Sequence, residues 1–306
     1  MRRFTLLFLA AAALFALAPL AVHADNTPAQ NNPPAPTAPA QPPYDDDPTP
    51  LMVAAGYGQI ETLKKLIGSG ANVNAQTSKK GNTALVYGTF VNNTDIVTAL
   101  LAAHADPNIA NKEGYRPINL AIYRDEPAMV TLLLDHGAKI DVPDHNAATP
   151  LMGAIVTNHP DLVTLLLNRG ADTNAASSNG SYTALMLAAM AGNASVVQAI
   201  LDHGAKVNLE TDEGQTALFL AALKGQTDTA RILLDHKADL GVQDLNGSTI
   251  LMAAVLSGSA DTVKLLIARG ASVNVRNNDD ATALGVADYF KKADIADILT
   301  KAGGEE

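Results

Sequence analysis

The sequence predicts an all-α fold, a solenoid of about eight stacked helix–turn–helix units. One phrase repeats at intervals of 33 or 34 residues: Thr (Arg once), then Leu or Ile two positions later, an Ala-rich stretch, and a second apolar run usually closed by Gly-Ala. A fixed period between about 20 and 50 residues indicates stacked supersecondary units. The leading positions are Thr49, Thr83, Arg116, Thr149, Thr183, Thr216, Thr249 and Thr282. Repeats therefore start near residues 48, 82, 115, 148, 182, 215, 248 and 281.

Residues 1–24 have the pattern of a secretory signal peptide. A basic start is followed by an unbroken apolar run from Leu6 to Ala18, and small residues precede an expected cleavage site after Ala24. The alternative is a retained membrane anchor. Pro19 interrupts that segment, which falls short of the roughly 20 residues of a comfortable span. We expect cleavage, and no integral membrane span in the mature chain.

Residues 25–47 predict a disordered linker ahead of a repeat domain over residues 48–304. Seven of its 23 residues are Pro, and most of the others are Ala, Asn, Gln or Asp. Such a composition cannot bury enough apolar area to order itself. A passive linker is the favoured interpretation, and a tether or spacer is the alternative.

The charge and the absence of cysteine limit the kinds of partner and chemistry. Without residues 1–24 the chain has 19 basic and 31 acidic residues, a net charge of −12. Such a chain repels nucleic acid and anionic membranes, so neither is an expected partner. The chain has no cysteine, which excludes thiol chemistry and suits an oxidising compartment. We expect the periplasm, with secretion as the second choice.

The sixth repeat shows how each unit is expected to fold. Thr216 precedes an Ala-rich helix over about Ala217 to Lys224 and can cap its free N–H groups. Gly225 ends this helix, and the carboxylate of Asp228 complements the dipole at the start of the second helix. The second helix is expected to end in a left-handed residue at Gly70, Gly137, Gly170, Gly204, Gly270 and Gly303, with His104 and Lys237 in the other two repeats.

A finger-like loop is expected between consecutive repeats. Its tips are expected near Gly81, Gly114, Ala147, Gly180, Gly214, Gly247 and Asp280, and Asn residues open five of the fingers, at Asn74, Asn108, Asn174, Asn208 and Asn274. The phrases Thr149-Pro150-Leu151-Met152 and Thr183-Ala184-Leu185-Met186-Leu187-Ala188-Ala189 resemble ankyrin repeats, as does Leu265 to Asn274. The resemblance implies two helices and a β-turn finger per repeat, a curved array with a concave groove, and binding to other proteins.

Two recurring residue types invite a chemical role, but structural roles are favoured. His136, His203 and His236 share one repeat position, yet adjacent repeats stack about 8–10 Å apart, too far to share one ion. Met52, Met152, Met186 and Met252 stand where ankyrin repeats commonly carry His; core packing is favoured over redox sensing. No catalytic phrase is present, so we expect neither an enzyme nor a metal or cofactor site.

The most pointed functional signal is the residue seven positions after each leading Thr or Arg. It is apolar or aromatic in seven of eight repeats, Gly56 being the exception, and the resemblance places it on the concave side. A continuous apolar stripe indicates a partner groove; half-buried packing between helices is the alternative that stays open. The candidate partner-binding residues are Phe90, Tyr123, Arg124, Val156, Met190, Leu223, Lys224, Leu256 and Tyr289, with an acidic finger of Glu210, Asp212, Glu213 and Gln215.

The sequence therefore favours a monomeric, exported scaffold that binds a protein partner through the groove and finger tips. Three alternatives remain within the class of binding proteins. The chain could protect or chaperone a periplasmic enzyme, neutralise a toxin as an immunity protein, or act on a host target as a secreted effector.

Overall fold

The computed structural model describes residues 47–144 and 147–306, which hold sixteen α-helices and no strand. The expected signal peptide and all but the last residue of the expected linker lie outside these residues. None of the described helices is long and apolar enough to cross a membrane. The helices are α1 (Pro50–Gly56), α2 (Ile60–Gly68), α3 (Ala84–Phe90), α4 (Thr94–Ala102), α5 (Pro117–Tyr123), α6 (Pro127–Asp135), α7 (Pro150–Val156), α8 (Pro160–Asn168), α9 (Ala184–Ala191), α10 (Ala194–Asp202), α11 (Ala217–Leu223), α12 (Thr227–Asp235), α13 (Ile250–Ser257), α14 (Ala260–Ala268), α15 (Ala283–Tyr289) and α16 (Ala293–Lys301).

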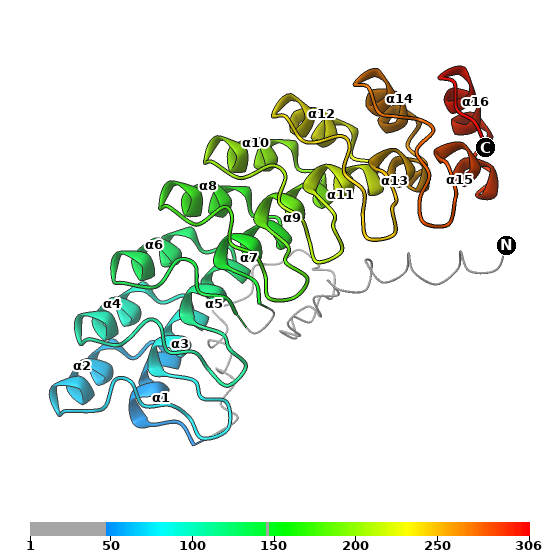
Figure 1. Ribbon diagram of the computed structural model, residues 1–306. Coiled ribbons are helices and arrows are strands. Elements are labelled where there is room, and N and C mark those ends of the chain that lie inside the picture. Colours follow the sequence, from blue (N-terminus) through cyan, green and yellow to red (C-terminus); the bar gives the residue numbers. More distant parts are fainter. Residues whose placement is uncertain (1–46, 145–146) are drawn as a thin grey trace, which may run out of the picture. The chain divides into compact units, whose positions relative to one another are not determined.

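The helices form consecutive pairs, one pair per repeat, which confirms the predicted helix–turn–helix solenoid. Within each pair the two helices pack on each other, and the odd-numbered helices stack against their neighbours in chain order (Figure 1). The side chains of α11 from Ala217 to Ala222 are all buried. Alanine at Ala221 and Ala222 lets neighbouring helices approach closely, so the core runs along the stacked odd-numbered helices.

The leading threonines cap the odd-numbered helices, as predicted. The Oγ1 atom of Thr216 accepts a hydrogen bond from the backbone N of Phe219 at 3.3 Å, and the other leading threonines make the equivalent bond. In the third repeat Arg116 cannot accept such a bond. There the side chain of Asn119 instead accepts from the backbone N of Arg116, at 3.0 Å. In this repeat the side-chain hydrogen bond at the start of the helix thus comes from Asn119, a residue of the helix itself.

A residue with positive φ follows the end of every even-numbered helix, two residues after its last residue. The six glycines predicted there are confirmed, and φ is +63° at His104 and +65° at Lys237. A left-handed residue also follows the end of every odd-numbered helix, a feature that the sequence analysis did not predict. Four of these residues are not glycine: Asn92, Asp125, Asn158 and Lys291. Each repeat thus reverses direction twice through a left-handed residue.

Each finger is closed by one residue that uses both its backbone and its side chain. In the sixth finger, the backbone N of Asp244 donates to the backbone O of Ser248 at 3.0 Å, and its Oδ1 atom accepts from the backbone N of Ser248 at 2.8 Å. Thr77, Asn111, Asp144, Ser177, Thr211 and Asn277 close the other fingers in the same way. All seven predicted tips have positive φ.

The two 34-residue repeats carry their extra residue inside the finger. Thr77 closes on Asn82 and Ser177 on Tyr182, five residues on, whereas the other fingers close four residues on, as Asn111 does on Tyr115. The helices before and after these fingers keep their positions in the stack. The 34-residue spacing of these two repeats therefore comes from one extra residue in the finger and not from a longer helix.

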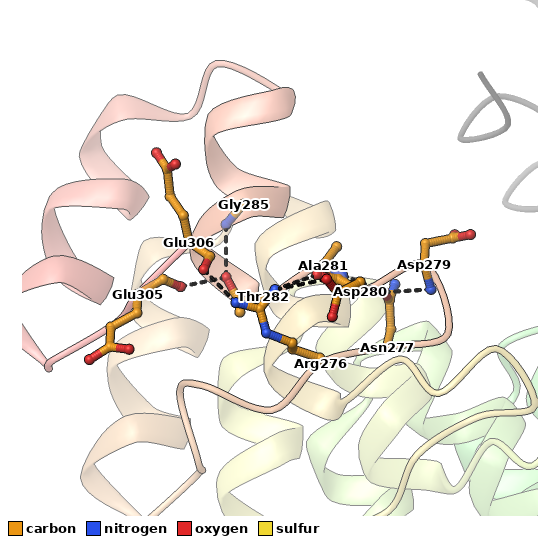
Figure 2. A network of polar contacts seen from close by, with 9 residues as sticks. All are labelled: Arg276, Asn277, Asp279, Asp280, Ala281, Thr282, Gly285, Glu305 and Glu306. Atoms are coloured by element: carbon orange, nitrogen blue, oxygen red, sulfur yellow. Dashed lines mark hydrogen bonds and ion pairs between the residues drawn. The ribbon is translucent and has the colours of Figure 1, made fainter. Parts of the chain in front are cut away.

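The residues after α16 are hydrogen-bonded to the last finger and to the cap of α15 (Figure 2). Arg276 donates to the backbone O of Glu306 at 2.6 Å, and the Oγ1 atom of Thr282 donates to the backbone O of Glu305 at 2.7 Å. The same Oγ1 atom accepts the capping bond from the backbone N of Gly285 at 3.2 Å.

Candidate protein-binding surface

The predicted apolar stripe lies at the C-terminal ends of the odd-numbered helices, and most of it is half-buried. Gly56 in the first repeat is buried, and Tyr289 in the last repeat is 56% exposed. The six members between them are all of intermediate exposure: Phe90, Tyr123, Val156, Met190, Leu223 and Leu256. The stripe therefore both packs between helices and presents apolar surface, and its role in binding stays a prediction.

The residue that follows each stripe member is more exposed and more varied. Arg124, Ala191 and Lys224 are exposed, and so are the aromatic residues Tyr57 and Phe290 at the two ends of the row. The guanidinium carbon of Arg124 lies 5.2 Å from the centre of the Phe90 ring in the preceding repeat. Such a cation–π contact keeps one face of Phe90 covered by a charged group.

Tyr123 has the most defined surroundings of the stripe. Its hydroxyl donates a hydrogen bond to Oδ2 of the buried Asp144, and its ring packs edge-on against Tyr115 at a centroid distance of 6.0 Å. A Cβ on Gly153 of the next repeat would lie 3.6 Å from this ring. Burial, and then the bond to Asp144, raises the pKa of Tyr123 above its usual value. Tyr123 therefore links helix α5 to the next finger as well as lining the stripe.

Side chains from the following repeat fix the turns where the stripe residues lie. Gln226 donates to the backbone O of Met190 at 3.4 Å, and the Nζ atom of Lys292 donates to the backbone O of Leu256 at 3.0 Å. These two bonds tie the backbone of the stripe at Met190 and Leu256 to the following repeat.

The predicted acidic finger is only partly at the surface. Glu210, Asp212 and Glu213 are exposed, but Gln215 is 7% exposed and cannot contact a partner. Its backbone closes the finger on Thr211, and it directly precedes Thr216, the buried cap of α11. The acidic surface of this finger therefore consists of three residues.

An exposed apolar residue that the sequence did not single out lies next to this acidic finger. The backbone N of Leu245, in the following finger, donates to the backbone O of Glu213 at 3.0 Å, and Leu245 is 70% exposed. Backbone bonds of the same kind join other adjacent fingers, for example Asp212 N to Gly180 O at 3.2 Å. Acidic and apolar groups are thus held side by side.

The histidines and methionines take structural roles, as the sequence favoured. Nδ1 of His136, His203 and His236 lies 2.8–2.9 Å from the carbonyl oxygen four residues earlier in its own helix. The four methionines at the recurring position, Met52, Met152, Met186 and Met252, are buried in the core. Across residues 47–144 and 147–306, no three His, Asp or Glu side chains are grouped so that they could hold a metal ion.

Comparison with known proteins agrees with this architecture. The family described as "Ankyrin repeats (3 copies)" matches residues 9–111, 89–177, 176–244 and 236–305. The solved ankyrin-repeat domain of Bcl-3, a member of the IkappaB family, is similar with a TM-score of 0.66 and 27% identity, covering 73% of this chain and all of that one.

Curated relatives share only short segments with the chain. "Ankyrin repeat and SAM domain-containing protein 6" of Rattus norvegicus is 38% identical over 82 residues, 27% of this chain and 9% of the relative. "Ankyrin repeat domain-containing protein 40" of Homo sapiens is 35% identical over 75 residues, 24% of this chain and 20% of the relative. The chain thus spans a fifth or less of these relatives' length. From the family match across the repeats and the sixteen stacked helices, we conclude that the chain belongs to the ankyrin-repeat family.

Proposed function

We propose that the protein is a non-enzymatic scaffold that binds a protein partner along the apolar stripe and the neighbouring fingers. Ankyrin repeats mediate protein–protein interaction, and proteins built from them are generally non-enzymatic scaffolds. The observation that carries the proposal for this chain is the stripe itself. From Phe90 to Leu256, six consecutive repeats present a half-buried apolar side chain at the same place.

The energetics favour an elongated partner segment. Full burial of one such side chain stabilises by about 1.5–3 kcal/mol, so covering the exposed part of a half-buried one contributes about 1 kcal/mol. Association costs roughly 4–15 kcal/mol. Contact with one or two repeats is therefore too weak, and the partner has to follow most of the stripe and reach the fingers.

The charge of the chain favours a partner with a basic rim. The whole chain carries a net charge of −10, and Glu210, Asp212 and Glu213 are exposed on one finger. Opposite charges at the edge of an interface speed association and select among partners. Leu245, beside Glu213, adds apolar area to the same contact.

We also propose that the protein acts in the periplasm after removal of residues 1–24. The basic start, the apolar run and the small residues before Ala24 support export, and the absence of cysteine is compatible with an oxidising compartment. Cell fractionation and N-terminal sequencing of the mature protein test this. A mature chain that begins at Asp25 supports export, and an unprocessed chain in the cytoplasmic fraction contradicts it.

A charge-insertion experiment tests the binding surface. Met190→Glu with Leu223→Glu places two carboxylates on the stripe, and we expect the loss of a partner captured by affinity purification from periplasmic extract. The control variant, Thr98→Glu with Ala268→Glu, adds the same charge at exposed positions of α4 and α14 and should retain the partner.

Thermal melting separates binding from stability. Loss of the partner with an unchanged melt supports the stripe as a binding surface, and a large fall in melting temperature shows that Met190 and Leu223 act as core. Lys224→Glu gives a second measure, because this residue is exposed and its replacement removes no apolar packing. Unchanged capture by both the double variant and Lys224→Glu would exclude the stripe.

A further inference from the structure

An asparagine side chain joins neighbouring repeats at one recurring position of the loop after the even-numbered helices. Oδ1 of Asn108 accepts from the backbone N of Lys139 at 2.8 Å, and its Nδ2 donates to the backbone O of Gly137 at 2.9 Å. Asn74, Asn174, Asn208 and Asn274 make the same two bonds to the loop of the following repeat. A carboxamide suits this place because it supplies one acceptor and one donor.

Gly241 occupies this position in the sixth repeat and has no side chain to make these bonds. Its backbone N donates to Oδ1 of Asp239 at 2.8 Å, as that of Asn108 does to Asp106 at the same distance. The backbone therefore follows the same turn, and only the carboxamide is missing. In the part of the chain that the structure describes, no hydrogen bond is recorded for the backbone N of Ser272 or the backbone O of Gly270, the two groups that the carboxamide would bind.

An open cavity of about 250 Å³ lies at this place, lined by the exposed Gly241, Gly270 and Ser272 together with Gln243, Thr249, Leu251 and Val275. A Cβ added to Gly241 would meet only Oδ1 of Asp239, at 3.4 Å. The space directly beside Gly241 is therefore open. The apolar side chains of Leu251 and Val275 form part of its wall.

We propose that this cavity binds a primary carboxamide, R–CO–NH₂. The carbonyl oxygen accepts from the backbone N of Ser272, and the amide nitrogen donates to the backbone O of Gly270. The chain itself fills the equivalent place with this group in five other repeats, so the spacing of donor and acceptor is already matched to it. The cavity lies near the start of α13, at the opposite end of this helix from Leu256 of the stripe, so this proposal does not depend on the proposed function.

The site can be tested by NMR titration of the ¹⁵N-labelled protein. Acetamide and N-acetyl-asparagine N-methylamide are the probes, and acetate and N,N-dimethylacetamide are the controls because neither can donate. We expect a saturable shift of the Ser272 amide with both probes and none with N,N-dimethylacetamide. Acetate should respond at least tenfold more weakly than acetamide, because a carboxylate can accept this bond, as Oδ1 of Asp141 does from the backbone N of Asp172 at 2.9 Å, but cannot donate the second one. Similar affinities would point to a small amide as the natural ligand. At least tenfold tighter binding of the asparagine probe would point to a side chain of another protein.

Two variants of Gly241 complete the test. Gly241→Asn fills the cavity from within, so the response of Ser272 to acetamide should weaken at least tenfold and the melting temperature should rise. Gly241→Ala changes the backbone preference without supplying an amide and should keep the response. The proposal is overturned if neither probe saturates Ser272, if N,N-dimethylacetamide acts as acetamide does, or if Gly241→Asn responds like the unaltered protein; the cavity then holds water alone.

Discussion

Removing the hydroxyl of Tyr123 separates the structural role of this residue from its predicted role in binding. Tyr123→Phe keeps the ring against Tyr115 and Gly153 but deletes the hydrogen bond to the buried Asp144. A hydrogen bond to a charged group contributes about 1.5–3 kcal/mol. Because Tyr123 is only half-buried, we expect the lower part of this range, about 1.5–2 kcal/mol, to be lost from the free energy of unfolding.

Urea denaturation followed by circular dichroism measures the loss. Long repeat arrays need not unfold in one step, so hydrogen exchange at Ala148, whose backbone N donates to Asp144 at 3.1 Å, gives a local measure. Tyr289→Phe is the matched control, because Tyr289 is mostly exposed and should change stability by less than about 0.5 kcal/mol. Equal stability of the two variants, with unchanged exchange at Ala148, would refute the structural role.

The pH dependence of stability gives an independent check of the same bond. Burial and then Asp144 raise the pKa of Tyr123 above its usual value of 10.0. Above this pH the unfolded chain releases the proton while the folded chain keeps it, so stability that is complete below pH 10 falls by about 1.4 kcal/mol per pH unit. Burial also raises the pKa of Tyr182, so some loss remains in any Tyr123 variant. Between pH 9 and pH 11, the unaltered protein should lose about 1.4 kcal/mol more than Tyr123→Phe; parallel curves would contradict the assignment.

Two further predictions concern the turns between repeats. His104→Gly and Lys237→Gly should each raise the free energy of unfolding by about 0.5 kcal/mol. Relief of the strain of positive φ (about 1–2 kcal/mol) exceeds the entropy cost of Gly (about 0.5–1 kcal/mol). A lower melting temperature of either variant would argue against this. Asn108→Ala should lower the free energy of unfolding by about 2 kcal/mol in urea titration, because two hydrogen bonds to the next repeat are lost. A change below about 0.5 kcal/mol would show that these two bonds contribute little.

The sequence was sufficient for features that depend on local backbone preference. Leading threonines cap helices because their oxygen reaches an N–H three residues on, and glycines end helices because they adopt positive φ freely. Both effects lie within one turn of helix, so the repeat pattern alone reveals them. His104 and Lys237 show that the preference is overridden where the stack requires a left-handed residue.

Features that join one repeat to the next could not be read from the sequence. Recurring asparagines were visible, but their partners are backbone atoms about 30 residues away, and any residue can provide those. The bond from Tyr123 to Asp144 needs a stripe Tyr followed by a finger-closing Asp; Tyr289 and Asp244 repeat these residue types singly, but no other described repeat combines them. Gln215 was predicted to be part of an acidic finger at the surface, yet it is buried and its backbone closes the finger on Thr211. A position in the repeat thus indicates a place in the stack and leaves the orientation of each side chain open.

The extra residue in the fingers that Thr77 and Ser177 close bears on how such a chain can change over evolutionary time. Insertions at loop tips are tolerated far better than insertions in helices, which would rotate every later side chain. Here two natural insertions are absorbed between the closing residue and the next cap. Fingers can therefore lengthen or shorten independently of one another, so that the contact surface can diversify while the stacked core keeps its register.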